Sequence, residues 1–425
     1  MNQTTNKNMQ PELHTCIGNC GECGQCTATN VPRLHTLFLG VTEDCNMRCR
    51  YCFVHHTPAK MTLDTAMKAL YFLIAQQESG NNQGLNITFF GGEPTLEWDS
   101  IIVPIVKRGR ELTNNKMSFN ITSNGVLLNR ERLDFMKENN MSLLFSFDGD
   151  EETQNYNRPM KGGQPSFALL KDKVKLILEY FPQMTFRATI YAPTVHHMLH
   201  NFEYAVGEGY KNFFFAPDSC GSVNDWTEQV FETYAEQLRM IADRVIEECR
   251  NGNYIGIAPI DRYYKTHLTG IIPYNEPGIR NIPGLGRCGV GGNGSALVAP
   301  DQKIYTCQEV FTNHEKRDAF LVGDLDNGID EEKARRIWAQ MDFTKLRDSE
   351  RYYGEHCEKC ALAGQCQGGC TVRQITVCNE FNVVPYVYCR IENINYQVAN
   401  DIVDALRDDK TFLAHTNPNS HWKQG

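Results

Sequence analysis

The sequence predicts an α/β fold, a partial TIM-like (β/α)6 barrel followed by a small cysteine-rich domain. Two observations indicate this class. Between residues 34 and 251, short runs rich in Val, Ile, Phe, Tyr and Leu alternate with amphipathic segments. After residue 287 the segments become short, glycine-rich and cysteine-rich, which is typical of a region whose folding depends on bound metal.

Six strands are expected, each short and often continuously apolar, as in a buried parallel sheet. They are expected at residues 34–41, 85–90, 116–122, 142–147, 184–191 and 210–216. Helices are expected between them, for example at 62–79 and 165–180, where apolar residues recur at helical spacing. This order of units implies a parallel sheet that curves into a partial barrel.

Five segments are predicted along the chain. They are a cysteine-rich N-terminal extension (1–33), the barrel (34–251), a bridge rich in Gly, Pro and Asn (252–287), a cysteine-rich domain (288–400) and a C-terminal tail (401–425).

Composition excludes several classes of protein. The net charge of −9 disfavours a non-specific nucleic-acid surface, which needs a basic stripe. No export signal and no run of about 20 apolar residues is visible, so we expect a cytoplasmic protein with no membrane partner. The 17 cysteines are odd in number and tightly spaced, which favours metal ligation over disulfides.

The first cysteine motif directly follows the first expected strand. Cys45, Cys49 and Cys52 form a C-x3-C-x2-C loop. Three thiolates can hold three irons of a cubane and leave the fourth iron open to a ligand. The alternative is a Cys3His zinc site closed by His55 or His56.

Polar and glycine-containing motifs follow the next strands. They are GGEP at 91–94, SNG at 123–125 and SFDG at 146–149, and Arg187 and Thr189 lie on the fifth strand. Because the carboxyl ends of barrel strands meet at one face, these groups are expected to surround one site. Glu93 offers a carboxylate to an ammonium group, and Asn124, Ser146 and Asp148 offer partners for hydroxyls.

On these motifs, residues 34–216 resemble the radical S-adenosylmethionine (radical SAM) superfamily. The resemblance implies that Cys45, Cys49 and Cys52 bind a [4Fe–4S] cluster whose open iron chelates S-adenosylmethionine. It further implies cofactor contacts from seven residues: Tyr51, Gly91, Gly92, Glu93, Asn124, Ser146 and Arg158. Arg158 is equally compatible with an ion pair at a helix end. The implied chemistry is reductive cleavage of the cofactor to a 5′-deoxyadenosyl radical that takes hydrogen from a substrate.

A second cysteine set resembles the SPASM extension of radical enzymes that modify peptides and proteins. It comprises Cys288, Cys307, Cys357, Cys360, Cys366, Cys370 and Cys389. The resemblance implies two auxiliary [4Fe–4S] clusters, one held by Cys357, Cys360, Cys366 and Cys389 and the other by Cys288, Cys307 and Cys370. The chain departs from the pattern at Gln302, where the family usually has glycine. Two zinc ribbons are the alternative.

A third set lies in the N-terminal extension. Cys16, Cys20, Cys23 and Cys26 are spaced to close a small iron–sulfur or zinc site, or to form a redox-active tail. The spacing does not choose the metal.

The resemblance favours a maturase that forms a thioether or C–C crosslink in a short, cysteine-containing ribosomal precursor peptide, with a flavodoxin- or ferredoxin-type electron donor. Formylglycine generation on a sulfatase is disfavoured, because relatives with that activity place Asp where this chain has Gln308. A non-catalytic electron-transfer protein is the third hypothesis.

Catalytic residues are not identified by any motif, and two candidates remain. Glu309 can replace the missing base, although strand alternation would point it elsewhere. Asp218 follows the sixth strand and can either face substrate or cap a helix. His196 and His197 are interpreted as capping or solvating a helix.

Overall fold

The computed structural model describes residues 34–78, 84–218, 223–269, 294–312, 316–340, 346–348, 357, 360, 362, 366 and 368–416. Cys288 and the four N-terminal cysteines of the predicted sites lie outside these residues.

The barrel strands are parallel, and they confirm the predicted fold class. They are β1 (Thr36–Thr42), β2 (Asn86–Gly91), β3 (Ser118–Ser123), β4 (Met141–Phe145), β5 (Thr185–Ile190), β6 (Asn212–Pro217) and β7 (Gly256–Ile257). The first six begin and end within two residues of the expected strands. A single bridge between Ser146 and Arg187 joins β4 to β5, so the sheet curves there without a continuous ladder.

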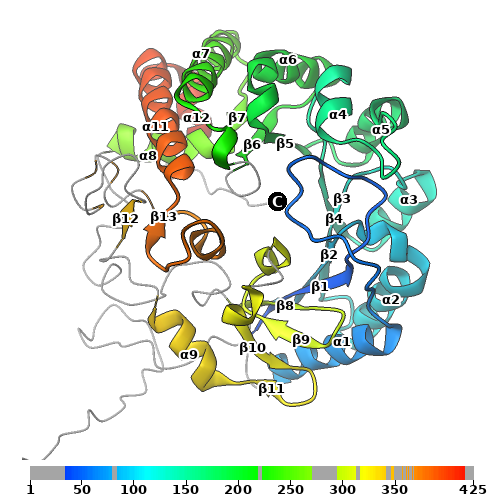
Figure 1. Ribbon diagram of the computed structural model, residues 1–425. Coiled ribbons are helices and arrows are strands. Elements are labelled where there is room, and N and C mark those ends of the chain that lie inside the picture. The colour runs from blue at the N-terminus through cyan, green and yellow to red at the C-terminus, as the bar shows by residue number, and fades with distance from the viewer. Residues whose placement is uncertain are drawn as a thin grey trace, which may run out of the picture.

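Helices cover the outside of this curved sheet (Figure 1). They are α1 (Leu63–Glu78), α2 (Val103–Leu112), α3 (Arg130–Glu138), α4 (Glu151–Asn157), α5 (Phe167–Tyr180), α6 (Met198–Glu208), α7 (Glu228–Arg250) and α8 (Ala258–Thr269). In α1, Ala66, Ala69, Leu70 and Leu73 are buried, which is the stripe that its sequence predicts.

The C-terminal part continues the barrel sheet. Strands β8 (Ser295–Val298), β9 (Lys303–Tyr305), β10 (Leu321–Asp324) and β11 (Gly328–Ile329) follow the order β11-β10-β9-β8-β1-β2-β3-β4. β8 pairs in parallel with β1, with Leu37 opposite Ala296, and the remaining pairs are antiparallel.

The other C-terminal elements are mostly helical. They are α9 (Glu331–Ala339), α10 (Thr371–Arg373), α11 (Tyr386–Leu406) and α12 (Lys410–Thr416), together with the short strands β12 (Arg347–Asp348) and β13 (Val383–Val384). Helix α11 packs on α7 and α8 at the far side of the barrel from β8 (Figure 1). The C-terminal part therefore contacts the barrel both at its first strand, β1, and at its last helices, α7 and α8.

Two predicted segments contain more regular structure than expected. The described part of the predicted bridge contains β7 and α8, because Ile257, Ile260 and Tyr264 are apolar and buried against the barrel. The predicted tail contains the end of α11 and all of α12, where Leu406 and Phe412 are buried. No described helix has both the length and the apolar character needed to cross a bilayer.

Candidate functional site

The loop that carries the first cysteine motif follows β1 and lies against the end of β2. Gly92 N–H donates to the Thr42 carbonyl (2.8 Å), and Glu93 N–H donates to the Asp44 carbonyl (2.9 Å). A Cβ atom on Gly91 or Gly92 would lie 2.1 Å from the carbonyl oxygen of Thr42 or Asp44, respectively. Only glycine permits this approach, so the two glycines fix where the cysteine loop begins.

Glu93 is an internal anchor between β2 and β3. Its carboxylate is buried and accepts hydrogen bonds from Thr95 N (3.1 Å), Ser123 Oγ (2.9 Å) and Asn124 N (2.7 Å). Burial raises the pKa of Glu93, and these hydrogen bonds oppose the rise. The conformation of both strand ends therefore depends on this one side chain.

The three cysteines of the loop lie in a water-poor environment at the carboxyl ends of the strands. Cys45 is buried, and Cys49 and Cys52 are half-buried. Burial raises the pKa of Cys45 to about 11 and that of Cys49 to about 12. Thiolates at these positions therefore require a compensating positive charge, which bound iron provides.

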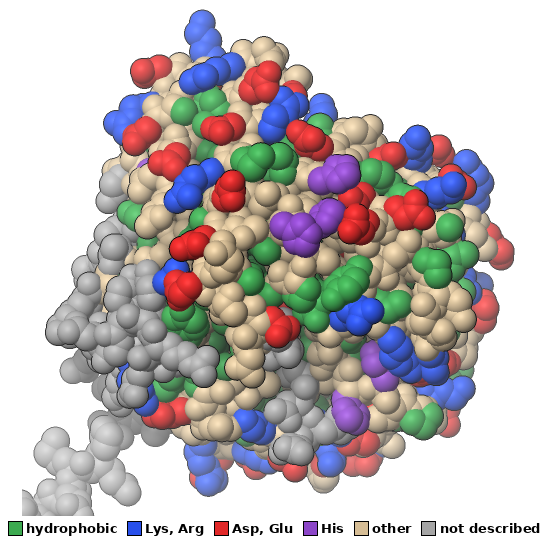
Figure 2. Space-filling view, turned by 45° about the horizontal axis from the view of Figure 1, so that its top comes forward, with side chains coloured by type: hydrophobic (Ala, Val, Ile, Leu, Met, Phe, Trp, Pro, Cys, Tyr) green, Lys and Arg blue, Asp and Glu red, His purple; other side chains and the backbone are tan. Residues whose placement is uncertain are grey.

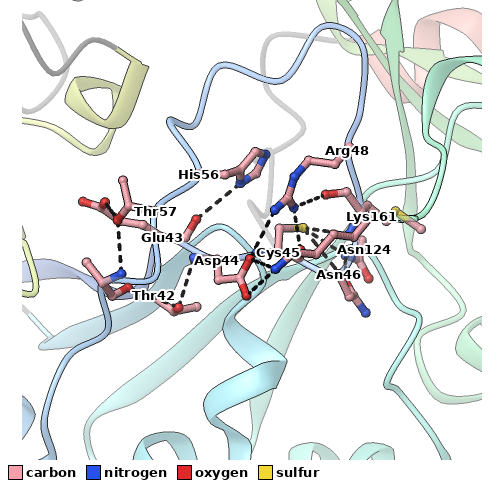
Figure 3. Close-up of polar contacts among 12 residues, drawn as sticks. Thr42, Glu43, Asp44, Cys45, Asn46, Arg48, His56, Thr57, Asn124 and Lys161 are labelled. Atoms are coloured by element: carbon pink, nitrogen blue, oxygen red, sulfur yellow. Dashed lines mark hydrogen bonds and ion pairs between the residues drawn. The ribbon is translucent and has the colours of Figure 1, made fainter. Parts of the chain in front are cut away.

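Side chains from the neighbouring strand ends contact the loop (Figure 3). Asn124 donates to Asn46 Oδ1 (2.7 Å) and points its amide toward Cys45 Sγ (3.7 Å). Cys45 Sγ also accepts from Met47 N–H (3.4 Å). Polar N–H donors directed at the sulfur suit a metal-bound thiolate, which accepts hydrogen bonds.

A second segment, residues 157–161, holds the other side of the loop. Arg48 N–H donates to the Pro159 carbonyl (2.8 Å), and Lys161 N–H donates to the Asn46 carbonyl (2.8 Å). The Lys161 ammonium contacts both oxygens of Asp44 (2.8 and 2.9 Å), and this hydrogen bond lowers the pKa of Asp44 (Figure 3). No sequence motif indicated this clasp, because its two halves are far apart along the chain.

Tyr51, Asp148 and Arg158 form a buried network beneath the loop. Tyr51 Oη donates to Asp148 Oδ2 (2.6 Å), and Arg158 donates to Tyr51 Oη (2.8 Å) and lies 3.8 Å from Asp148. Asp148 also accepts from Asn157 Nδ2 (3.1 Å) and Thr189 N (3.1 Å). Asp148 therefore accepts hydrogen bonds from groups within the protein. Arg158 forms an ion pair with Asp148, which is the alternative role that its sequence position allowed.

Ser146 and Arg187 meet where β4 passes to β5. Ser146 is buried, and its hydroxyl makes no hydrogen bond to any described residue. Arg187 is half-buried, and burial lowers its pKa; the carboxylate of Glu309 in the C-terminal part opposes this effect. A neutral hydroxyl and a cation are therefore available at this strand junction.

The zinc alternative for this loop is not supported by the geometry of the described residues. The ligands of a tetrahedral zinc ion lie about 4 Å from one another. Around Cys45, Cys49 and Cys52, no three described Cys, His, Asp or Glu ligand atoms lie within 4.8 Å of one another. His56 directs Nδ1 to the Glu43 carbonyl (3.3 Å). A larger cluster fits sulfurs that are further apart.

Several cysteines of the second set show the same local hydrogen bond as Cys45. In each case the backbone N–H of the second residue after the cysteine donates to its sulfur. The distances are 3.4 Å at Cys307, 3.4 Å at Cys360 and 3.3 Å at Cys366. Cys249, which belongs to no predicted site, instead contacts Asp409 Oδ1 (3.5 Å). Cys357, Cys370 and Cys389 are half-buried.

Gln302 stands where the SPASM pattern has glycine, and it adopts the left-handed turn that a glycine would favour. Its φ is 67°, in the left-handed region that favours glycine, and its N–H donates to the Ala299 carbonyl (3.0 Å). The turn is therefore retained despite the larger residue.

Glu309 lies on a short 3-10 helix, η6 (Gln308–Thr312), and not on a strand. The alternation of side chains along a strand, which predicted that Glu309 points elsewhere than its neighbour Gln308, therefore does not apply. The Glu309 carboxylate is 3.6 Å from the Arg373 guanidinium.

Asp218 is buried after β6, where its carbonyl accepts from Trp226 Nε1 (2.7 Å). Thr227, and not Asp218, caps the next long helix.

Comparison with known proteins gives three kinds of match. Residues 39–202 match the Radical SAM superfamily. The chain is 22% identical to a cysteine-type anaerobic sulfatase-maturating enzyme of Clostridium perfringens, over 80% of this chain and 89% of that one. It resembles the structure of anSMEcpe with bound AdoMet (TM-score 0.70, 20% identity, 91% of this chain and 98% of the other). It also resembles Streptococcus suis SuiB bound to precursor peptide SuiA (TM-score 0.53, 15% identity, 82% and 74%).

Proposed function

The chain is an enzyme of the radical SAM superfamily, and from this premise we propose that it oxidises a side chain of a peptide or protein substrate. The observation that carries the proposal is the loop of Cys45, Cys49 and Cys52. Its thiols are shielded from water, need a compensating cation, and lie at the strand ends where barrel enzymes hold their reactive groups.

In this proposal the three cysteines hold a [4Fe–4S] cluster. When bound, the cluster and S-adenosylmethionine supply one electron and a carbon-centred radical that takes a hydrogen atom from substrate. Ser146 has an uncommitted hydroxyl for the cofactor, and Asn124 stands beside the cysteine loop. Gly91, Gly92 and Glu93 set the position of the loop, and their backbone lies next to it.

Tyr51 and Arg158 are proposed to act at the cofactor from fixed positions. Both side chains are buried, Tyr51 donates to Asp148 and Arg158 donates to Tyr51, so their orientation does not have to be established when the cofactor binds. Arg158 retains a buried Nε–H without a partner among the described residues. That donor is available to an anionic group of the cofactor.

The second cysteine set is proposed to hold two auxiliary clusters, with the ligands implied by the SPASM resemblance. Support comes from the N–H to sulfur hydrogen bonds at Cys307, Cys360 and Cys366, which repeat the arrangement at Cys45. The N-terminal set (Cys16, Cys20, Cys23 and Cys26) remains a proposed metal or redox site, and a flavodoxin- or ferredoxin-type protein remains the proposed electron donor.

Two oxidations fit the substrate side of the site. The first is a thioether or C–C crosslink in a cysteine-containing ribosomal peptide. The second is formylglycine formation, which the sequence disfavours at Gln308. Glu309 favours the second reaction, because its carboxylate contacts Arg373 of the C-terminal part and its charge raises the pKa of Arg187 in the barrel. It can take the proton that an oxidised Cys or Ser side chain must release. The similarity to the sulfatase-maturating enzyme supports the same choice.

The test is an anaerobic incubation of reduced, cluster-loaded protein with S-adenosylmethionine and synthetic peptides that carry a central Cys or Ser. Formation of 5′-deoxyadenosine tests the radical step. A hydrazide-reactive aldehyde in the peptide identifies formylglycine, whereas loss of hydrogen without an aldehyde identifies a crosslink. The matched control replaces Cys45, Cys49 and Cys52 by Ala. Absence of 5′-deoxyadenosine from iron-replete wild type would contradict the proposal.

A further inference from the structure

We infer that Asp150, His197 and His200 form a binding site for a single divalent transition metal of the zinc type. The site lies on the outer surface, where α4 and α6 begin, and it is separate from all three cysteine sets. Among the described residues, this is the one group of three Cys, His, Asp or Glu side chains with ligand atoms all within 4.8 Å of one another.

The geometry brings two imidazoles to one carboxylate oxygen. His200 Nδ1 lies 3.0 Å and His197 Nδ1 lies 3.9 Å from Asp150 Oδ2. His197 ends the short helix η3 (Ala192–His197), and His200 lies in the first turn of α6. The two histidines are therefore three residues apart, on one face of the chain. Figure 2 shows histidine and acidic side chains gathered beside one another on the molecular surface.

The carboxylate is held in place by contacts that leave one oxygen directed at the histidines. Asp150 Oδ1 caps α4 by accepting from Thr153 N–H (2.8 Å). Asp150 N–H donates to Asn201 Oδ1 (3.0 Å), and a Cβ on Gly149 would lie 2.2 Å from that same oxygen. The loop before α4 is thus fastened to α6, so the ligand distances are set by the fold.

A fourth residue orients one of the proposed ligands. Glu152 Oε1 lies 3.5 Å from Nε2 of His197, the ring nitrogen that faces away from Asp150. Metal-binding histidines usually donate their second ring N–H to a carboxylate, which fixes the tautomer and makes the ligand more basic.

The donor set selects the class of metal. Two imidazole nitrogens and one carboxylate oxygen suit zinc and its neighbours, whereas Mg²⁺ and Ca²⁺ take oxygen ligands. Three protein ligands leave the fourth tetrahedral position open to water or to a group from a partner. The metal would join α4 to α6 at Asp150, two residues after Asp148, which supports Tyr51 and Arg158.

The test is zinc binding to the full-length, cluster-loaded protein. Protein is dialysed anaerobically against Zn²⁺ alone, and zinc and iron are counted by mass spectrometry. We expect the double variant His197→Ala/His200→Ala to bind about one zinc fewer than wild type. His196→Ala is the matched control, because His196 is adjacent and lies outside the group; it should bind as wild type does.

A second variant tests the orienting contact. Glu152 is 76% exposed, so Glu152→Gln should fold normally and weaken the zinc affinity about tenfold. Equal zinc in wild type and the double histidine variant, at equal iron content, would overturn the inference. Since the readout is zinc bound, failure of this site would leave the proposed radical reaction untouched.

Discussion

At the scale of single residues, the cysteine loop depends on side chains that will never touch iron. Tyr51 is the clearest case, because its hydroxyl is both donor to Asp148 and acceptor from Arg158 in a buried setting. Removing a shared partner leaves two charged groups less well satisfied, which costs more than an exposed hydrogen bond.

Tyr51→Phe should therefore lower the free energy of unfolding by about 1–3 kcal/mol and reduce 5′-deoxyadenosine formation, while iron content is retained. Chemical denaturation and an iron assay check these effects. Tyr71→Phe is the control, since Tyr71 is exposed and contacts only Arg108 by its hydroxyl. Equal stability of Tyr51→Phe and wild type would show that Asp148 and Arg158 do not need the phenol.

Gly92→Ala should displace the loop, because the new Cβ would lie 2.1 Å from the Asp44 carbonyl oxygen. We expect loss of the iron bound by Cys45, Cys49 and Cys52, measured as a lower iron-to-protein ratio. Gly207→Ala is the control, as its Cβ meets no atom within 4 Å. A Gly92→Ala protein with full iron content would refute the requirement for close approach.

At the scale of elements, the sequence predicted the strands whose positions are determined by local patterns of apolar residues. The six predicted barrel strands, β1 to β6, were located within two residues, because each is a short apolar run between turn signals. Glu309 was misplaced because β9 ends at Tyr305 and η6 begins at Gln308, so strand alternation was extended past the strand's end. The contacts of Asp44 with Lys161 and of β1 with β8 are long-range, and no local pattern encodes them.

The turn at Gln302 gives an element-scale prediction. A residue with a side chain at φ 67° is strained, so Gln302→Gly should raise the free energy of unfolding by about 0.5–1 kcal/mol. Gln302→Ala retains the strain and removes only the contact with Lys68 (3.2 Å), so it should not stabilise. Denaturation midpoints measured side by side decide between these outcomes.

Asp261 in α8 gives a pH dependence. Burial raises the pKa of its carboxyl to about 7, although it accepts from Ile257 N–H (3.1 Å). The folded chain thus binds this proton more tightly than the unfolded chain. The resulting stability is complete below pH of about 4 and is lost as pH rises through 7.

Asp261→Asn should remove this part of the pH dependence, so its stability relative to wild type should rise by about 4 kcal/mol between pH 4 and 8. Unfolding midpoints of cluster-loaded protein across this range provide the measurement. Asp243→Asn, at an exposed position of α7, should follow wild type. A constant difference between Asp261→Asn and wild type would disprove the assignment.

At the scale of the whole molecule, the site combines residues from distant parts of the chain. Glu309 of η6 forms an ion pair with Arg373 of α10, and its charge raises the pKa of Arg187 in β5. The sequence identified the cysteine loop and the motifs at the strand ends, because these are contiguous. It did not show that the charge of Glu309 would act on Arg187, because this effect depends on how the C-terminal part packs on the barrel.

Glu309→Gln should abolish or strongly reduce peptide product, at least about 100-fold if Glu309 is the proton acceptor. Formation of 5′-deoxyadenosine should continue, since the cysteine loop is unchanged. Glu332→Gln, which alters an exposed carboxylate of α9, is the control. Parallel loss of both products would assign Glu309 a structural role instead.

The parallel pairing of β8 with β1 has a consequence for how the protein is synthesised. The first strand of the barrel acquires its second neighbour only after Val298 has been made, some 260 residues later in the chain. Until then a nascent chain leaves one side of β1 without backbone partners, and such an edge invites pairing with other chains. A gene fragment that stops at the end of α7 is for this reason a poor source of isolated barrel.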